Sequence, residues 1–156
     1  MKFAEGTTVP VEKSRAEIER LLTRYGAERF ASGWDQAGAV IFFDYKNRRV
    51  RFVLPLPTQT VVRGKEPRGW FRMSAPQREK YLRDRTDAEM RRRWRALLLT
   101  IKAKLEAVTN EITSFDEDFL AHFVLPSGQT FAEWAVPYLQ SASEAMPPLL
   151  PGRDGG

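Results

Sequence analysis

Three adjacent acidic residues form the densest cluster of metal-binding groups in the chain. Asp116, Glu117 and Asp118 follow one another, and grouped carboxylates are ligands that hard cations prefer. The same residues come directly after Ser114, which forms an S-x-x-E pattern with Glu117. That pattern is typical of a helix start, where negative charge interacts favourably with the helix dipole. A metal site and a capped helix are both compatible with this stretch, and the capped helix is favoured.

Asp35 is followed nine residues later by the stretch Asp44-Tyr45-Lys46. This spacing resembles the D…(D/E)-x-K arrangement of restriction-endonuclease-like nucleases, in which two carboxylates hold a divalent metal and a lysine assists the reaction. The resemblance implies a metal-dependent nuclease that uses Asp35, Asp44 and Lys46, with Asp44 and Lys46 on one face of a strand. Asp35 itself falls in a predicted turn, and the other two residues lie close to the next turn.

Other catalytic schemes have few residues to draw on. The chain has no cysteine and one histidine, His122, which excludes disulfides, thiolate catalysis and cysteine-based zinc sites. His122 lies among Leu120, Ala121 and Phe123 and is interpreted as a core or rim histidine. The sequence contains no glycine-rich phosphate loop or dinucleotide fingerprint, so no cofactor is predicted.

Basic residues are concentrated in the middle of the chain. Residues 46–104 hold 18 lysines and arginines against 5 acids, a net charge of +13 in a chain whose total is +5. The remainder therefore carries −8, most of it after residue 104. Such a block predicts an anionic partner, nucleic acid first, although a solvated helix face with a basic loop is the alternative.

The predicted nucleic-acid contacts come from a strand, a loop and a helix. In the loop, cations surround Trp70 and Phe71, an interleaving that suits phosphate contact and base stacking. Alternatively, the two rings plug the core where the loop rejoins it. Binding through these residues would be weakly sequence-specific, to DNA or RNA, and would weaken with salt. The predicted contact residues are Arg49, Arg51, Arg63, Trp70, Arg72, Arg91, Arg92, Arg95 and Lys102.

A long central helix is expected over residues 86–112 because apolar residues recur there at helical spacing. Its core stripe is Met90, Trp94, Leu97, Leu98, Ile101, Leu105, Val108 and Ile112. Leu99 and three alanines lie on the far side, which predicts that the helix is covered from two directions. A capping pattern at Ser74 starts a helix upstream, and Thr86-x-x-Glu89 leaves open whether that helix continues unbroken into the central one.

The remaining elements predict an α+β fold. It consists of an N-terminal helix, a three-stranded antiparallel meander, the long central helix and two short C-terminal helices. The N-terminal helix is expected from a Ser14/Glu17 capping box to Tyr25, with strands at 30–34, 39–45 and 48–56. Short helices at 115–123 and 131–140 are expected to pack on the body through Phe119, Leu120, Phe123, Phe131, Trp134 and Tyr138. Residues 1–140 are interpreted as one domain and residues 141–156 as a flexible tail.

No run approaches the roughly 20 apolar residues of a membrane span, and the first residues lack the apolar block of a secretory signal. A cytoplasmic protein without a membrane partner is therefore expected. The oligomeric state is left open by the sequence.

Two resemblances extend over most of the chain. Helix, three strands and helix, over residues 14–112, resembles the element order of double-stranded-RNA-binding domains. In that family a lysine-rich motif at the start of the second helix straddles phosphates, and the matching stretch here, residues 74–80, does not reproduce it. The segments SRAEIERLLTRYGAERFASGWD, VRFVLPLP, RRRWRALLLTIKAKLEAV and FLAHFVLPSGQTFAEW are similar to a family of short uncharacterised proteins of phages and mobile elements. That resemblance implies an accessory role in phage or plasmid DNA biology, or an interaction with a host protein.

These observations favour a non-enzymatic nucleic-acid-binding accessory protein. The alternative is a protein-interaction module that binds a host factor or a second copy of itself, and the nuclease is a second alternative.

Overall fold

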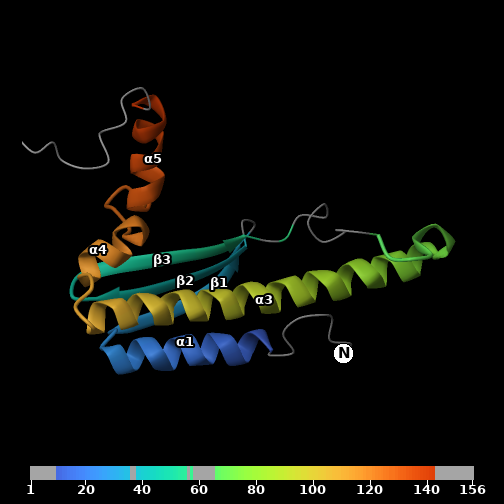
Figure 1. Cartoon of the computed structure of the whole chain (residues 1–156), viewed down its shortest axis with the longest axis horizontal. Coiled ribbons are helices and arrows are strands. Elements are labelled where there is room, and N and C mark those ends of the chain that lie inside the picture. The colour runs from blue at the N-terminus through green and yellow to red at the C-terminus, as the bar shows by residue number, and fades with distance from the viewer. Residues whose placement is uncertain (1–9, 36–37, 56, 58–65, 143–156) are drawn as a thin grey trace, which may run out of the picture.

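The computed structural model describes residues 10–35, 38–55, 57 and 66–142. The order of elements confirms the predicted α+β fold, with an N-terminal helix, an antiparallel sheet, one long helix and two short helices after it (Figure 1). In chain order they are α1 (Val11–Tyr25), β1 (Arg29–Asp35), β2 (Gly38–Tyr45), β3 (Arg48–Pro55), the 3-10 turn η1 (Trp70–Arg72), α3 (Ala75–Thr109), α4 (Phe115–Phe119), the 3-10 turn η2 (Leu120–His122) and α5 (Phe131–Ser141).

The three strands form an antiparallel sheet in the order β1-β2-β3. Asp44 in the central strand pairs with Arg29 on one side and with Arg49 on the other. The β2–β3 connection is the predicted two-residue turn, in which Lys46 and Asn47 both have positive φ, at 44° and 61°. A primed turn of this kind matches the twist of the strands it joins.

Helices α1 and α3 lie side by side on one face of the sheet (Figure 1). Alternate residues of the strands point into the layer between sheet and helices, as the strand period of two requires. The buried core is made of Ile18, Leu22, Ala39, Ile41, Phe43, Val50, Phe52, Met90, Trp94, Leu97, Leu98, Ile101, Leu105, Phe119 and Phe123. The residues between them on the strands, such as Phe42, Arg51 and Val53, lie on the opposite face, called the outer face below.

The start of α1 differs from the prediction. The helix begins at Val11, with Pro10 as its N-cap, and Ser14 is fully buried inside the helix. Val11 packs against the core, so tertiary contact extends the helix one turn beyond the predicted capping box. The end of the helix was predicted correctly, because Gly26 adopts a left-handed φ of 113° that ends it.

Helix α3 is unbroken from Ala75 to Thr109. It begins at the predicted Ser74 signal, where Ser74 and Gln77 form a complete capping box. Thr86 does not restart the helix, since its hydroxyl donates to the carbonyl of Leu82 one turn earlier. At the other end, Ile112 lies beyond the helix and is 80% exposed, so its assignment to the core stripe was wrong.

Cover of α3 from two directions is also not observed. Leu99, on the side away from the sheet, is 51% exposed. Among the described residues, α3 packs on the sheet and α1, with α4 near its C-terminal end and Trp70 near its N-terminal end, and its far side stays exposed. None of the described helices combines the length and the apolar composition needed to cross a membrane.

The two C-terminal helices pack differently from each other. Phe119 of α4 is fully buried, and Phe123 forms a bridge to Val50 of β3, as expected for residues that close the core. By contrast, Leu120, Trp134 and Tyr138 are 41%, 46% and 62% exposed. The prediction that α5 packs on the body was therefore wrong, and Figure 1 shows α5 projecting from it. Residues 143–156, most of the predicted tail, lie outside the described residues.

Candidate functional site

The residues of the predicted nuclease pattern lie apart. Asp35 lies where β1 ends and Asp44 lies at the far end of β2, so most of a strand separates them, roughly 20 Å. Lys46 is in the turn beyond β2. The two carboxylates therefore cannot bind a single metal ion. The metal site that the nuclease alternative requires is not formed by these residues.

Asp44 is engaged by arginines. Nε and Nη2 of Arg49 donate to its two oxygens at 2.8 and 2.9 Å, and Arg29 lies at 3.7 Å. The hydrogen bonds from Arg49 hold the pKa of Asp44 below its usual range. The same contacts occupy Arg49, which the sequence assigned to phosphate binding.

The acidic cluster at the start of α4 also has structural partners. Asp116 pairs with Arg48 at 3.4 Å, and Asp118 accepts from Lys104 at 2.9 Å. The backbone N–H of Glu117 donates to the capping hydroxyl of Ser114. Among the described residues, no group of three or more acidic or histidine side chains is placed to hold a metal ion.

Arg51 joins the sheet to the root of α5. Its Nη2 donates to Oε1 of Glu133 at 2.6 Å and its Nη1 donates to the carbonyl of Gly128 at 3.0 Å. The hydrogen bond from Arg51 lowers the pKa of Glu133, and the amide of Thr130 acts in the same direction. Arg51 is thus a structural residue of the outer face.

The four predicted contacts on α3 do not form one exposed surface. Arg91 is buried, at 4% exposure, and Arg92 donates to Glu89 of the same helix at 2.6 Å. Arg95 forms an ion pair of 3.6 Å with Glu17 of α1. Lys102 is exposed.

The predicted contact residues of the loop also differ in exposure, some being buried and others exposed. Trp70 is buried, at 7% exposure, against Tyr81, and the guanidinium of Arg78 lies over its ring. Trp70 therefore does not present a stacking surface, whereas Phe71 is 85% exposed. Arg72 is exposed in η1, at the end of α3 that projects beyond the sheet (Figure 1). Arg63 lies outside the described residues.

One group of cations does converge, in a shallow groove of about 260 Å³ between α1 and α3. Arg20 and Arg24 face Arg95 and Lys102 across a floor of leucines. The two arginines of α1 were not predicted as contacts, because their helix mixes charges of both signs. A signal was present in the spacing of the lining residues, because positions 17, 20, 21 and 24 repeat the steps of positions 95, 98, 99 and 102. Such steps place each set on one side of its helix. This cationic groove is lined by Glu17, Arg20, Leu21, Arg24, Arg95, Leu98, Leu99 and Lys102.

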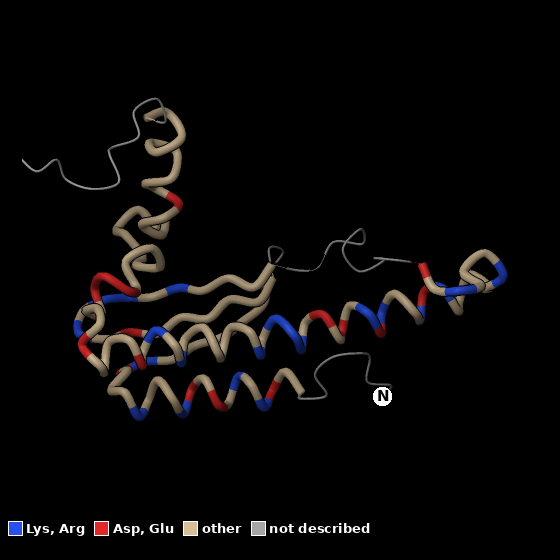
Figure 2. Tube along the Cα trace, in the orientation of Figure 1, with Lys and Arg blue, Asp and Glu red and all other residues tan. Residues whose placement is uncertain are grey.

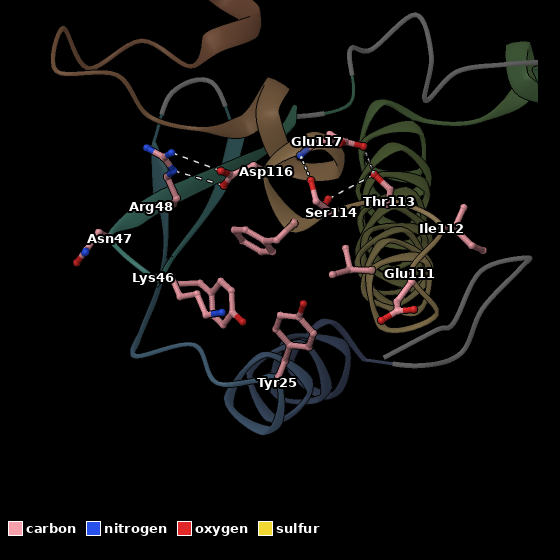
Figure 3. Close-up of a pocket in the computed structure, with 13 residues that line it drawn as sticks. Tyr25, Lys46, Asn47, Arg48, Glu111, Ile112, Thr113, Ser114, Asp116 and Glu117 are labelled. Carbon is pink, nitrogen blue, oxygen red and sulfur yellow. Dashed lines mark hydrogen bonds and ion pairs between the residues drawn. The ribbon is translucent and has the colours of Figure 1, made fainter.

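A wider hollow of about 1040 Å³ lies where α1, the β2–β3 turn and the α3–α4 connection meet (Figure 3). Aromatic rings of Tyr25, Tyr45 and Phe115 form its floor. Burial raises the pKa of Tyr25, with Tyr45 beside it, so its hydroxyl stays protonated near neutral pH. The rim carries charges of both signs, including the Arg48–Asp116 pair. This hollow shows no activated nucleophile or base.

His122 is half-buried and stacks on Phe52, with ring centres 4.1 Å apart. Burial lowers the pKa of His122, and Lys104 adds to the effect. The imidazole is therefore neutral at physiological pH, which agrees with its interpretation as a core or rim histidine.

Helix α5 presents the most unusual surface in the described structure. It has no buried residue, although apolar side chains occupy most of its positions. Figure 2 shows it almost free of charge, and its one charged side chain is Glu133, already paired with Arg51. This apolar surface of α5 consists of Trp134, Val136, Tyr138 and Leu139, which are 46%, 44%, 62% and 69% exposed.

A second apolar feature lies on the outer face of the sheet. A hollow of about 640 Å³ follows the middle of the strands, with Arg51 and Glu133 at its rim. Gly33 contributes no side chain there, and nothing lies within 4 Å of where its Cβ would be. Val40 in the hollow is already buried, at 8% exposure. The apolar residues that line this outer-face hollow are Ala31, Gly33, Trp34, Val40, Phe42 and Val53, and Ser32 and Asp35 line it as well.

Comparisons with protein-family models, with curated proteins and with solved structures find no match to this chain.

Proposed function

We propose that this protein is a non-enzymatic protein-interaction module and that the apolar surface of α5 is its contact element. The single observation that carries the proposal is that α5 exposes Trp134, Val136, Tyr138 and Leu139 and buries no residue. Trp134 and Tyr138 lie on one side of the helix with ring centres 5.3 Å apart, and Val136 and Leu139 extend the apolar surface around it. Exposed apolar surface of this kind marks interaction sites on proteins. Aromatic anchors of this kind also dominate binding energy at interfaces.

The intrinsic stability of α5 supports the same conclusion. Isolated helices shorter than about 12 to 15 residues are marginal in water, and α5 has 11 residues. Pro137 lies inside it, where it removes one backbone hydrogen bond and crowds the preceding turn. The capping box of Thr130 and Glu133 stabilises the first turn. Cover by a partner would supply the stabilisation that the rest of the helix lacks.

Ion pairing within the basic block favours the protein-interaction module over nucleic-acid binding, which the sequence alone had favoured. Of the predicted phosphate contacts, Arg49, Arg51, Arg92 and Arg95 each have a carboxylate within 4 Å, and Arg91 is buried. Protein binding through apolar surface needs none of these cations. A photo-crosslinking side chain at position 138, in cells treated with nuclease after irradiation, tests the proposal.

The expected result is a defined protein adduct that forms from position 138 and is lost in a Trp134→Ser background. A crosslinker in place of exposed Glu79, near the far end of α3, is the matched control and should give none. Absence of any protein adduct from position 138 would overturn the proposal.

Nucleic-acid binding is kept as a second candidate function because of the cationic groove. Arg20, Arg24 and Lys102 are exposed along its rims. If these three contact phosphates, the slope of log affinity against log salt is about −3 for duplex DNA. Replacing all three by Glu should abolish a gel shift at low salt, whereas replacing Lys80 and Arg83, exposed elsewhere on α3, should not. Equal shifts by both variants would remove this candidate.

A further inference from the structure

We propose that the partner of α5 is a second copy of this chain, and that α5 of each copy docks in the outer-face hollow of the other. The inference rests on the proposed function and names the occupant of the same surface. It joins two apolar features of the described structure, the uncovered helix and the uncovered sheet face, into one interface.

The dimensions of the two surfaces are compatible. Helix α5 has 11 residues, which is about 16 Å at the α-helical rise. The strands have seven or eight residues each, about 23 to 27 Å, so the helix fits along the sheet. A helix on the outer face would give the sheet a second covering layer, opposite α1 and α3, and apolar sheet faces are normally covered in this way.

Charge does not oppose contact between like copies. The one acid of α5, Glu133, is neutralised by Arg51 of its own chain at 2.6 Å. The hollow is apolar at Ala31, Gly33, Val40, Phe42 and Val53. Apart from the Arg51–Glu133 pair, its lining carries one charged group, Asp35, which accepts from the N–H of Gly38 at 3.1 Å. Two identical copies can therefore approach through these surfaces without the like-charge repulsion that would oppose self-association.

The root of α5 explains why the helix does not cover its own sheet. The N–H of Phe131 donates to the carbonyl of Phe123 at 2.9 Å, and the N–H of Val124 donates to the carbonyl of Arg49 at 2.8 Å. Together with the Arg51–Glu133 pair, these bonds hold the start of α5 beside β3. They fix the direction of the helix, which points away from the body (Figure 1). Folding back onto the same sheet would require breaking them, whereas a two-fold arrangement satisfies both copies at once.

Sedimentation equilibrium of the purified full-length chain tests the inference, with three variants. Tyr138→Glu places a charge on the apolar surface of α5. Gly33→Gln fills the hollow, and it leaves the fold intact because a side chain at Gly33 has open space. Phe71→Glu alters an exposed aromatic residue at the far end of α3 and is the control. The wild type and the control should dimerise with equal constants, while each of the other two should lose about tenfold or more in association constant. Circular dichroism verifies that each variant is folded.

Mixing the two defective variants gives the sharpest outcome. Tyr138→Glu retains an intact hollow and Gly33→Gln retains an intact helix, so a mixture forms one of the two contacts. Association should therefore be stronger in the mixture than in either variant alone. Dimerisation of Gly33→Gln at wild-type strength would overturn the inference, since α5 would then pair with α5. A wild type that stays monomeric at about 0.5 mM would also overturn it, whereas a persisting adduct with a different protein from position 138 would leave the proposed function intact.

Discussion

The guanidinium of Arg51 donates to the carboxylate of Glu133 at 2.6 Å and links the outer face of the sheet to the first turn of α5. Glu133 is also the N3 residue of the capping box of that helix. One carboxylate thus stabilises the start of α5 and fixes its attachment to β3.

A double-mutant cycle on Arg51→Met and Glu133→Gln should show this coupling. Both side chains are partly exposed, at 19% and 49%, so we expect a coupling free energy of about 0.5 to 1 kcal/mol by urea denaturation. Arg49→Met with Glu133→Gln is the control cycle, because Arg49 lies on the same strand face but pairs with Asp44. Equal coupling in the two cycles would refute the specific link.

Phe119→Ala should be strongly destabilising. Phe119 is fully buried and contacts Phe43 and Phe52 edge-on, so its loss leaves a cavity worth about 3 to 5 kcal/mol in the free energy of unfolding. Ile112→Ala, at a residue 80% exposed, should change it by less than about 0.5 kcal/mol. A large effect at Ile112 would mean that the core stripe extends as the sequence predicted.

Arg91→Glu and Arg92→Glu should behave differently although the residues are adjacent. Arg91 is 4% exposed, so the substitution buries a carboxylate and should lower the thermal midpoint steeply or prevent folding. The side chain of Arg92 is 54% exposed, and its substitution should be tolerated with a small loss from repulsion by Glu89. Similar midpoints for the two variants would show that Arg91 is accessible.

His122 should make the protein less stable in mild acid. The folded-state pKa of His122 is lowered by burial, so the unfolded chain binds the proton more readily than the fold does. Stability is then highest above the unfolded pKa of about 6.5 and is lost as pH falls below it. Thermal melts of wild type and His122→Gln between pH 7.5 and 5 test this, and the variant should lose less stability over that range. Parallel curves would assign the acid sensitivity to other groups.

Elements with strong local signals were predictable from the sequence, and long-range pairing was not. Spacing and residue type predicted the helical stripe through Trp94 and Ile101 and the turn at Lys46-Asn47. The structure confirms both. The start of α1 was missed because Val11 is recruited by core contact. The apolar residues of α5, such as Trp134 and Tyr138, predicted burial as those of α3 did. No local signal indicates that the start of α5 is held by bonds to Phe123 and Arg51, which direct the helix away from the body.

The candidate site follows the same division. Clustering of arginines predicted a basic surface, but ion pairs such as Arg49–Asp44, Arg95–Glu17 and Arg51–Glu133 depend on strand register and helix packing. The burial of Trp70 was left open by the sequence and is decided by its contact with Tyr81. The cationic groove needs two helices in register, which neither stripe reveals alone.

The central claim is that the apolar surface of α5 is uncovered within its own chain and becomes covered when a second copy of the chain binds it. Hydrogen exchange of the amides of Phe131–Ser141, measured on the purified full-length chain at about 1 µM and at about 0.5 mM, tests this most directly. The account predicts fast exchange in the dilute sample and marked slowing in the concentrated one, with the amides around Ile101 unchanged. Equally slow exchange of α5 at both concentrations would contradict it, because the helix would then be covered within its own chain.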